Sequence, residues 1–308
     1  MVPSDFYTSL PEKGVIQFSG AEKEKYLQGQ ITADVNSLNS SKALLACHCD
    51  FKGKTWSVSY LFTWQDDLLM VLHRSVLEKS LSELKKYGVF AKVTIIENSD
   101  NWLISAGLGK ALEAEVVRIF GHLPELHQET IQNEHGIVMA LQGNVMRYII
   151  LQPQNAALKL DVEQTLAGAN YWEVEDIKAG IADIRATTSN EFVPQMMNLQ
   201  QLDAISFTKG CYMGQEVVAR TKYLGKNKRA AFRVYAEGVH PTSAGDSLEI
   251  QLGENWRPAG KILRSATIKG QSWLLAVLAH GTEIGTVMRL KESPESMFTV
   301  LPQPYELT

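Results

Sequence analysis

Residues 55–64, TWSVSYLFTW, carry a large apolar or aromatic side chain at every second position from Trp56 to Trp64. Alternate residues of a β-strand point to the same face, so this period of two predicts a strand with one strongly apolar face. Such a face is stable only when it packs against another layer, and its backbone needs partner strands. This segment therefore requires the chain to build a layered sheet.

Flanking segments predict the rest of this sheet and helices against it. ALLACHC (43–49) is typical of a buried strand, and DFKGK (50–54) of the turn that follows it. Leu27, Ile31 and Val35 form one stripe at helical spacing. Strand, strand, helix and strand in that order belong to a ferredoxin-like α+β unit. The expected elements are strands at 14–20, 43–49, 55–64, 68–73 and 90–96 and helices at 21–35 and 75–88.

The rest of the sequence predicts a second α+β unit, followed by a region with a different residue pattern. After residue 228, short strand candidates are separated by Gly, Pro and Ser clusters, which is typical of a small all-β barrel or sandwich. We expect an α+β region of two subdomains over 1–225 and a C-terminal β domain over 226–308, with the basic stretch 224–229 as the hinge. The second round is expected to contain strands at 102–106, 136–141 and 145–151 and a helix at 110–121.

Charge and composition limit the compartment and the partners. The chain has 30 basic and 34 acidic side chains and a net charge of −4, so we expect no general polyanion or DNA binding, and any nucleic-acid contact must be a local patch. The first residues lack a signal-peptide pattern, and no apolar run approaches the roughly 18 residues of a membrane helix. Three cysteines, an odd number without a spacing framework, argue against structural disulfides. A cytoplasmic protein with reduced thiols is expected.

Two of the cysteines, in Cys47-His48-Cys49, lie within a predicted strand. His48 then points away from both cysteines, and no second cluster supplies the further ligands that a zinc site needs. We interpret the segment as a structural strand and expect no metal site.

The third cysteine lies in KGCYMGQEVVAR, residues 209–220. Glycines near Cys211 suit a tight backbone path, and a helix that starts just after it, between a lysine and an arginine, favours the thiolate. The alternative is a buried cysteine in a well-packed turn. No His or Asp is placed as its base, so a protease-type dyad has no support. The candidate site consists of Lys209, Cys211, Gln215, Glu216 and Arg220.

Two further features suggest ligand contacts. Residues 220–233 hold six basic side chains and no acid, which is typical of a solvated linker or of an anion site for RNA phosphates or for several carboxylates. Trp172 lies among acidic residues, where its ring could stack on a flat heterocycle or pack in the core. The basic residues are Arg220, Lys222, Lys226, Lys228, Arg229 and Arg233.

Together these segments resemble the YgfZ family of folate-binding proteins, which is related to the aminomethyltransferase (T-protein) of the glycine cleavage system. SFTKGCYMGQEVVAR (206–220) matches the family's cysteine motif at every fixed position. Supporting matches are FSGAEKEKYLQGQITADV (18–35), HCDFKGK (48–54) and FVPQMMNLQQLDAISF (192–207).

The resemblance implies an α+β, T-protein-like fold in which two α+β units and a C-terminal β-barrel surround a central cavity that holds tetrahydrofolate. It also implies an accessory role for iron–sulfur enzymes, including those that modify tRNA by methylthiolation. Cys211 would be the functional thiol beside the folate cavity. Trp172 would contact the folate, and Arg229 would receive its glutamate tail.

Three positions depart from the related transferases. Ser80 aligns with their catalytic Asp, so an active aminomethyltransferase is the less favoured alternative. Lys178 replaces a Glu that holds the pterin edge, and Lys13 replaces a tryptophan near the first strand. Glu173, Glu175 and Asp176 are nearby carboxylates that could substitute. An RNA-binding module acting through 220–233 is the third hypothesis.

Overall fold

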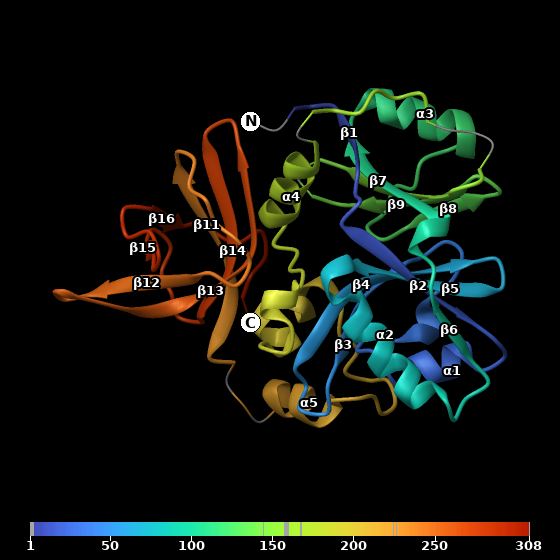
Figure 1. Ribbon diagram of the computed structural model, residues 1–308, viewed down its shortest axis with the longest axis horizontal. Helices are drawn as coiled ribbons and strands as arrows, with labels where there is room; N and C mark the ends of the chain where they lie inside the picture. The colour runs from blue at the N-terminus through green and yellow to red at the C-terminus, as the bar shows by residue number, and fades with distance from the viewer. Residues whose placement is uncertain are drawn as a thin grey trace.

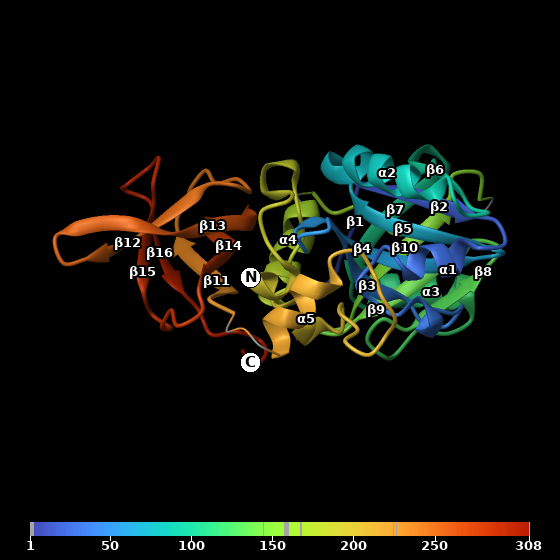
Figure 2. The same ribbon diagram turned by 90° about the horizontal axis from the view of Figure 1, so that it is seen from below.

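The described part of the chain forms two five-stranded antiparallel sheets and a closed six-stranded barrel in the computed structural model (Figure 1). The barrel lies at one end of the molecule, the two sheets lie at the other, and α4 and α5 lie between them (Figure 2). The structure describes residues 3–143, 145–156, 160–166, 168–223, 225 and 227–307.

The first sheet has the strand order β3-β4-β5-β2-β6. Its strands are β2 (Lys13–Ser19), β3 (Leu44–Cys49), β4 (Thr55–Trp64), β5 (Asp67–His73) and β6 (Thr94–Glu97), and α2 (Arg74–Gly88) packs against it. On β4, Tyr60, Phe62 and Trp64 join the hydrophobic cluster between the two sheets, as their alternation predicts. Trp56 instead packs edge-on against His48.

The helix expected over 21–35 is much shorter than its apolar stripe suggested. Helix α1 covers only Lys23–Gln28, and the turn η1 covers Val35–Ser37. After Gly29 the backbone of Ile31 and Thr32 pairs with β3 instead. Hydrogen bonding to a partner strand therefore overrides the local period, although Leu27, Ile31 and Val35 are all buried as expected.

The second sheet has the order β1-β7-β10-β9-β8. It consists of β1 (Phe6–Ser9), β7 (Trp102–Leu108), β8 (Thr130–Asn133), β9 (Gly136–Leu141) and β10 (Arg147–Pro153), with α3 (Lys110–Phe120) on its outer face. The sequence did not predict β1 or β8. One hydrophobic cluster fills the space between the two sheets, and Trp64 meets Trp102 there with ring centroids 5.2 Å apart.

Helix α4 (Gly168–Lys178) contacts both the second sheet and the barrel. The chain then passes through the short turns η3 (Ala186–Thr188), η4 (Pro194–Met197) and η5 (Leu199–Leu202) before α5 (Gln215–Tyr223). The sequence predicts the start of α5 just after Cys211 but not the bounds of α4.

The C-terminal strands close into the barrel order β11-β14-β13-β12-β15-β16. Closure comes from pairing of Val234 with Val300, so the barrel alternative is confirmed over the sandwich. Leu224 and Lys226 of the expected hinge lie outside the described residues. The strands are β11 (Arg229–Glu237), β12 (Ser247–Leu252), β13 (Asn255–Ile268), β14 (Gln271–Ala279), β15 (Val287–Leu290) and β16 (Met297–Val300).

Candidate functional site

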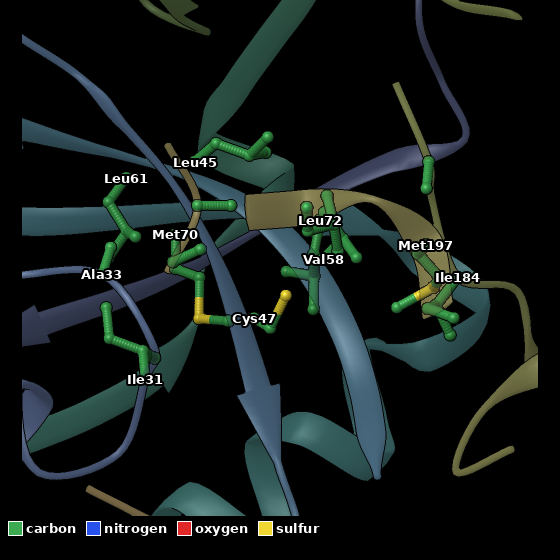
Figure 3. Packing of buried hydrophobic residues seen from close by; sticks show 14 of the residues in the cluster. Ile31, Ala33, Leu45, Cys47, Val58, Leu61, Met70, Leu72, Ile184 and Met197 are labelled. Atoms are coloured by element: carbon green, nitrogen blue, oxygen red, sulfur yellow. The ribbon is translucent and has the colours of Figure 1, made fainter. Parts of the chain in front are cut away.

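The three cysteines have very different environments. Cys47 and Cys49 are fully buried, and Figure 3 shows the Cys47 sulfur among Val58, Met70 and Leu72. Burial raises the pKa of Cys47 and that of Cys49, the latter to about 12, which keeps both thiols protonated. Cys211, in contrast, is exposed on the loop before α5. Cys211 is therefore the thiol that solvent and partners can reach.

The buried cysteines confirm the interpretation of 43–49 as a structural strand. His48, which lies between them in the sequence, is also buried, and its Nδ1 lies 2.8 Å from the Ser80 hydroxyl oxygen. Within the described residues, no group of three or more His, Cys, Asp or Glu side chains is placed to hold a metal ion.

Lys209 anchors the loop that presents Cys211. Its ammonium donates hydrogen bonds to the carbonyl oxygens of Ile31 (2.9 Å) and Ala33 (2.6 Å), and the residue is 8% exposed. Burial lowers the pKa of Lys209 to about 8, partly offset by Asp34. The expected partnership of this ammonium with the thiolate is therefore replaced by bonds to the chain that follows α1.

Gly214 fixes the other end of the loop. Its φ is +81°, and an added Cβ would lie 2.5 Å from the Asp50 carbonyl oxygen and 2.8 Å from the Gly53 Cα. The turn that follows β3 therefore packs directly on the start of α5, and only glycine fits there. Gln215 and Glu216 form the first turn of α5, as predicted.

Residues 192–207 and the cysteine loop also make hydrogen bonds to the chain around α1. The Ser206 amide donates to the Thr32 carbonyl (2.9 Å), and the Thr32 hydroxyl donates to the Ala204 carbonyl (2.6 Å). The Met213 amide donates to the Gly29 carbonyl (3.0 Å). All four segments that carried the family resemblance thus meet in one place, and we call this set of contacts the Cys211 frame. The segments are recognisable in the sequence, but only the fold brings them together.

A second candidate region lies where the two sheets, α4 and the barrel meet. The cavity there is only about 30 Å³ in volume, roughly the space of one water molecule. Its polar lining includes Lys13, Asp176, Asp183 and Arg264, and Trp172 forms part of its wall. The expected central cavity exists, but it is nearly filled by side chains.

Ion pairs fill this central cavity. Lys13 Nζ lies 2.6 Å from an Asp183 carboxylate oxygen, and Arg264 reaches both Glu173 (2.6 Å) and Asp176 (2.7 Å). A register shift between Ile262 and Arg264 marks a bulge in β13 at this point, which is a common way to re-aim a side chain. The central ion network consists of Lys13, Arg147, Glu173, Asp176, Asp183, Arg185 and Arg264.

The central ion network holds its acids ionised. Burial, the largest single cause, raises the pKa of Glu173 and of Asp176, but Arg264 together with the other nearby cations outweighs burial and lowers each pKa below its usual range. Burial is also the largest single influence on Asp183, but Lys13, Arg185 and Arg264 together outweigh it and lower the pKa of Asp183. These carboxylates are therefore paired with cations of the same chain and are not free to hold a ligand.

Trp172 does not offer an open stacking face in this structure. The residue is 2% exposed, and the Arg147 guanidinium carbon lies 4.6 Å from the ring centroid. Small-molecule sites usually have volumes of about 300–1,000 Å³, so a pterin does not fit beside Trp172 in this conformation. Lys178 lines a different groove and pairs with Glu175 at 2.9 Å.

Arg229 and Ser80 lie away from Trp172. Arg229 is exposed, and its guanidinium donates to the Ala259 carbonyl at 3.4 Å. Ser80 is buried beneath the first sheet, where its hydroxyl meets His48 and Ser57 (2.7 Å). The alignment of Ser80 with a catalytic carboxylate therefore does not correspond to a position on the central cavity.

The basic side chains of the stretch 220–233 lie in different surroundings. The Arg233 guanidinium donates to the carbonyls of Lys178 and Pro302, so it holds the C-terminal tail in place. The Lys222 ammonium rests 3.7 Å from the centroid of the Phe207 ring. Lys226 lies outside the described residues.

In the part of the chain that the structure describes, no helix is long and apolar enough to cross a membrane.

Comparison with known proteins gives consistent results for the whole chain. A family model described as "YgfZ, beta-barrel domain" matches residues 227–293. The tRNA-modifying protein YgfZ of Yersinia enterocolitica is 38% identical over 305 residues, with 97% of this chain and 92% of that protein covered. The protein of the same name from Pectobacterium carotovorum is also 38% identical, with 97% and 91% covered.

A solved structure shares the fold. The crystal structure of the glycine cleavage system aminomethyltransferase T from Bartonella henselae superimposes with a TM-score of 0.72 and covers 98% of this chain and 86% of that chain. Sequence identity is 12%, so this likeness establishes the T-protein-like fold and nothing about activity.

Proposed function

The chain belongs to the YgfZ family, and on that premise we propose that it is a cytoplasmic accessory protein in tRNA modification whose working group is the Cys211 thiol. The relatives at 38% identity carry the name tRNA-modifying protein, which supports the process. The choice of Cys211 rests on the geometry of this chain.

The Cys211 frame is the observation that carries the proposal. Lys209 and Gly214 are held by backbone atoms from two other parts of the chain, while the cysteine between them is exposed. A buried lysine and a glycine that admits no Cβ are costly features for an ordinary surface turn. Their combination supports a loop built to present one thiol in a defined position.

Such a thiol suits partners with iron–sulfur clusters. Thiolate sulfur is the usual protein ligand of these clusters, and an exposed cysteine can reach a cluster or a reactive group on another protein. We propose that the partners are iron–sulfur enzymes such as tRNA methylthiotransferases. Gln215, Glu216 and Arg220 lie on the helix that follows Cys211 and would form the surrounding contact surface.

Tetrahydrofolate is the cofactor that we propose from family membership. Binding against Trp172 would require Arg147 to leave the indole ring and the Lys13–Asp183 pair to open, because together they occupy the space. Folate, when bound, would supply one-carbon chemistry. The residues of this chain contribute an exposed thiol and, at the central cavity, a network of ion pairs, and we assign them no step in aminomethyl transfer.

The test is complementation in cells that lack their own copy, with methylthiolated tRNA nucleosides quantified by mass spectrometry. Cys211→Ser should give the level of the empty vector, whereas Thr208→Ala, at an exposed position in the same loop, should give the wild-type level. Wild-type methylthiolation in the Cys211→Ser strain would overturn the proposed role of the thiol.

A further inference from the structure

Exposed cations gather along one edge of the molecule, around α5. Within the described residues, none of the five cations there forms an ion pair with a carboxylate. They are Lys52 in the turn after β3, Arg220 and Lys222 on α5, and Lys228 and Arg229 at the entry to the barrel. These cations outnumber the exposed carboxylates of Glu216, on α5, and Asp203, which lines a hollow beside Lys222. The edge is therefore a local basic patch on a chain whose net charge is −4.

Close contacts place the three segments that carry these cations side by side. The turn after β3 packs on the start of α5, since a Cβ added to Gly53 would lie 3.1 Å from the Val217 Cβ. Farther along α5, the Gln195 side-chain amide donates to the Val218 carbonyl (2.6 Å), and the Gln195 carbonyl accepts from the Asn227 side chain (2.7 Å). Figure 1 shows the β3–β4 turn, α5 and the chain that enters β11 along the lower edge of the molecule. The five cations therefore lie on one surface, which we call the α5 basic surface.

Two exposed aromatic rings lie among the cations of this surface. Phe51 is 71% exposed, with the Lys52 ammonium 5.5 Å from its ring centroid, and Tyr223 is 64% exposed, with the Lys222 ammonium 5.4 Å from its ring centroid. Arg220 lies three positions before Tyr223 and therefore shares a face of α5 with it. Rings this exposed gain little from packing within the chain. They are available to a partner.

The combination of cations and exposed rings separates the possible partners. A double-stranded nucleic acid offers phosphates but keeps its bases stacked inside the helix, and an acidic protein segment needs the cations but has no planar groups for the rings. Unpaired RNA offers both, because its phosphates attract lysine and arginine and its bases stack on aromatic side chains. The surface therefore favours single-stranded RNA.

We propose that the α5 basic surface binds single-stranded RNA, such as an unpaired loop of a tRNA. Lys222 and Lys228 bind phosphates, and Tyr223 and Phe51 stack on bases. The inference rests on the proposed function, because the process that it names acts on tRNA. It extends that function by giving the chain a direct contact with RNA next to the loop that presents Cys211, which leads into α5.

The experiment is fluorescence anisotropy of the full chain with a labelled, unstructured RNA oligonucleotide, free or annealed to its complement. We expect saturable binding of the single strand and weaker binding of the duplex. The double variant Lys222→Gln/Lys228→Gln should weaken single-strand binding about tenfold, because two phosphate contacts are lost. It should also make the slope of log affinity against log salt shallower by about 1.4, since each phosphate contact to a single strand contributes about 0.7.

A matched control separates the surface from net charge. The double variant Lys85→Gln/Lys110→Gln removes the same charge from exposed lysines of α2 and α3, and it should bind RNA as the wild type does. Equal weakening by the two double variants would show a general charge effect and overturn the proposal.

The rings have their own test. Tyr223→Ala should weaken single-strand binding by about fivefold or more and leave the salt slope unchanged, because a stacking contact is lost but no charge. Tyr223→Phe keeps the ring and should bind as the wild type does. A duplex that binds as tightly as the single strand would overturn the role of the rings.

Two further outcomes overturn the proposal: no saturable RNA binding at physiological salt, or a polyglutamate peptide that binds the surface more tightly than RNA does, which would identify an acidic protein segment as the partner. Neither outcome would affect the proposed role of the thiol. Cys211→Ser removes no charge and no ring from the α5 basic surface and should bind RNA normally, so loss of methylthiolation in that strain tests the thiol alone.

Discussion

The central cavity and the Cys211 frame are two polar regions of one molecule that hold buried charge in different ways. At the central cavity, four cations and three carboxylates form ion pairs and leave a volume of about 30 Å³. In the Cys211 frame, two backbone carbonyl oxygens hold the buried Lys209 ammonium, and the thiol two positions later is exposed. The comparison teaches that buried charge alone does not mark a binding site: ion pairs can fill a cavity, while a cation held by carbonyl oxygens can anchor a loop whose thiol stays accessible.

The largest effect is expected from breaking the central ion network. Arg264→Met should leave Glu173 and Asp176 buried with too few cations and should lower the free energy of unfolding by about 3–5 kcal/mol. Urea denaturation measures this loss. Arg289→Met is the matched control in the barrel, because Arg289 pairs with Glu249 at 2.8 Å but is partly exposed. The control should lose about 1 kcal/mol or less.

Equal losses in the two arginine variants would contradict the contrast. The central charges would then be as well solvated as the barrel pair, and the central cavity would be more open than the ion pairs suggest.

A smaller effect is expected from the Cys211 frame. Gly214→Ala places a Cβ against Asp50 at a φ of +81° and should cost about 1–3 kcal/mol in the free energy of unfolding. Gly210→Ala meets no atom within 4 Å and should stay within about 0.5 kcal/mol of the wild type. Thermal and urea unfolding of the two variants provide the measurement. If Gly210→Ala proved the more damaging change, the frame would be wrongly assigned.

The smallest effect is a pH dependence that comes from Lys209. Because its folded pKa is lowered from 10.5 to about 8, the unfolded chain binds more protons between these values. The free energy of unfolding should therefore rise with pH in this window, by at most about 1.4 kcal/mol per pH unit. The measurement is the difference between wild type and Lys209→Met, which removes the contributions of other groups. Parallel profiles would show that the ammonium is not buried as described.

Much of the fold can be predicted from the sequence, because strands and helices require apolar side chains to recur at short, regular intervals. The alternation from Tyr60 to Trp64, the apolar run 43–49 and the Gly- and Pro-separated strands after residue 228 all predict elements that are present. The failures lie where a partner overrides local preference. The stripe through Ile31 looks helical, but its backbone pairs with β3.

For the candidate site, the sequence by itself determined which segments matter and which cysteine differs from the others. The motif around Cys211, the strand that buries Cys47 and the basic run from Arg220 are all readable along the chain. Only the tertiary structure decided how these parts are used. Lys209 meets carbonyls 176 and 178 positions away, and Lys13 meets Asp183 170 positions away. Such contacts have no local signal, because desolvation and ion pairing depend on which groups the fold brings together rather than on spacing along the chain.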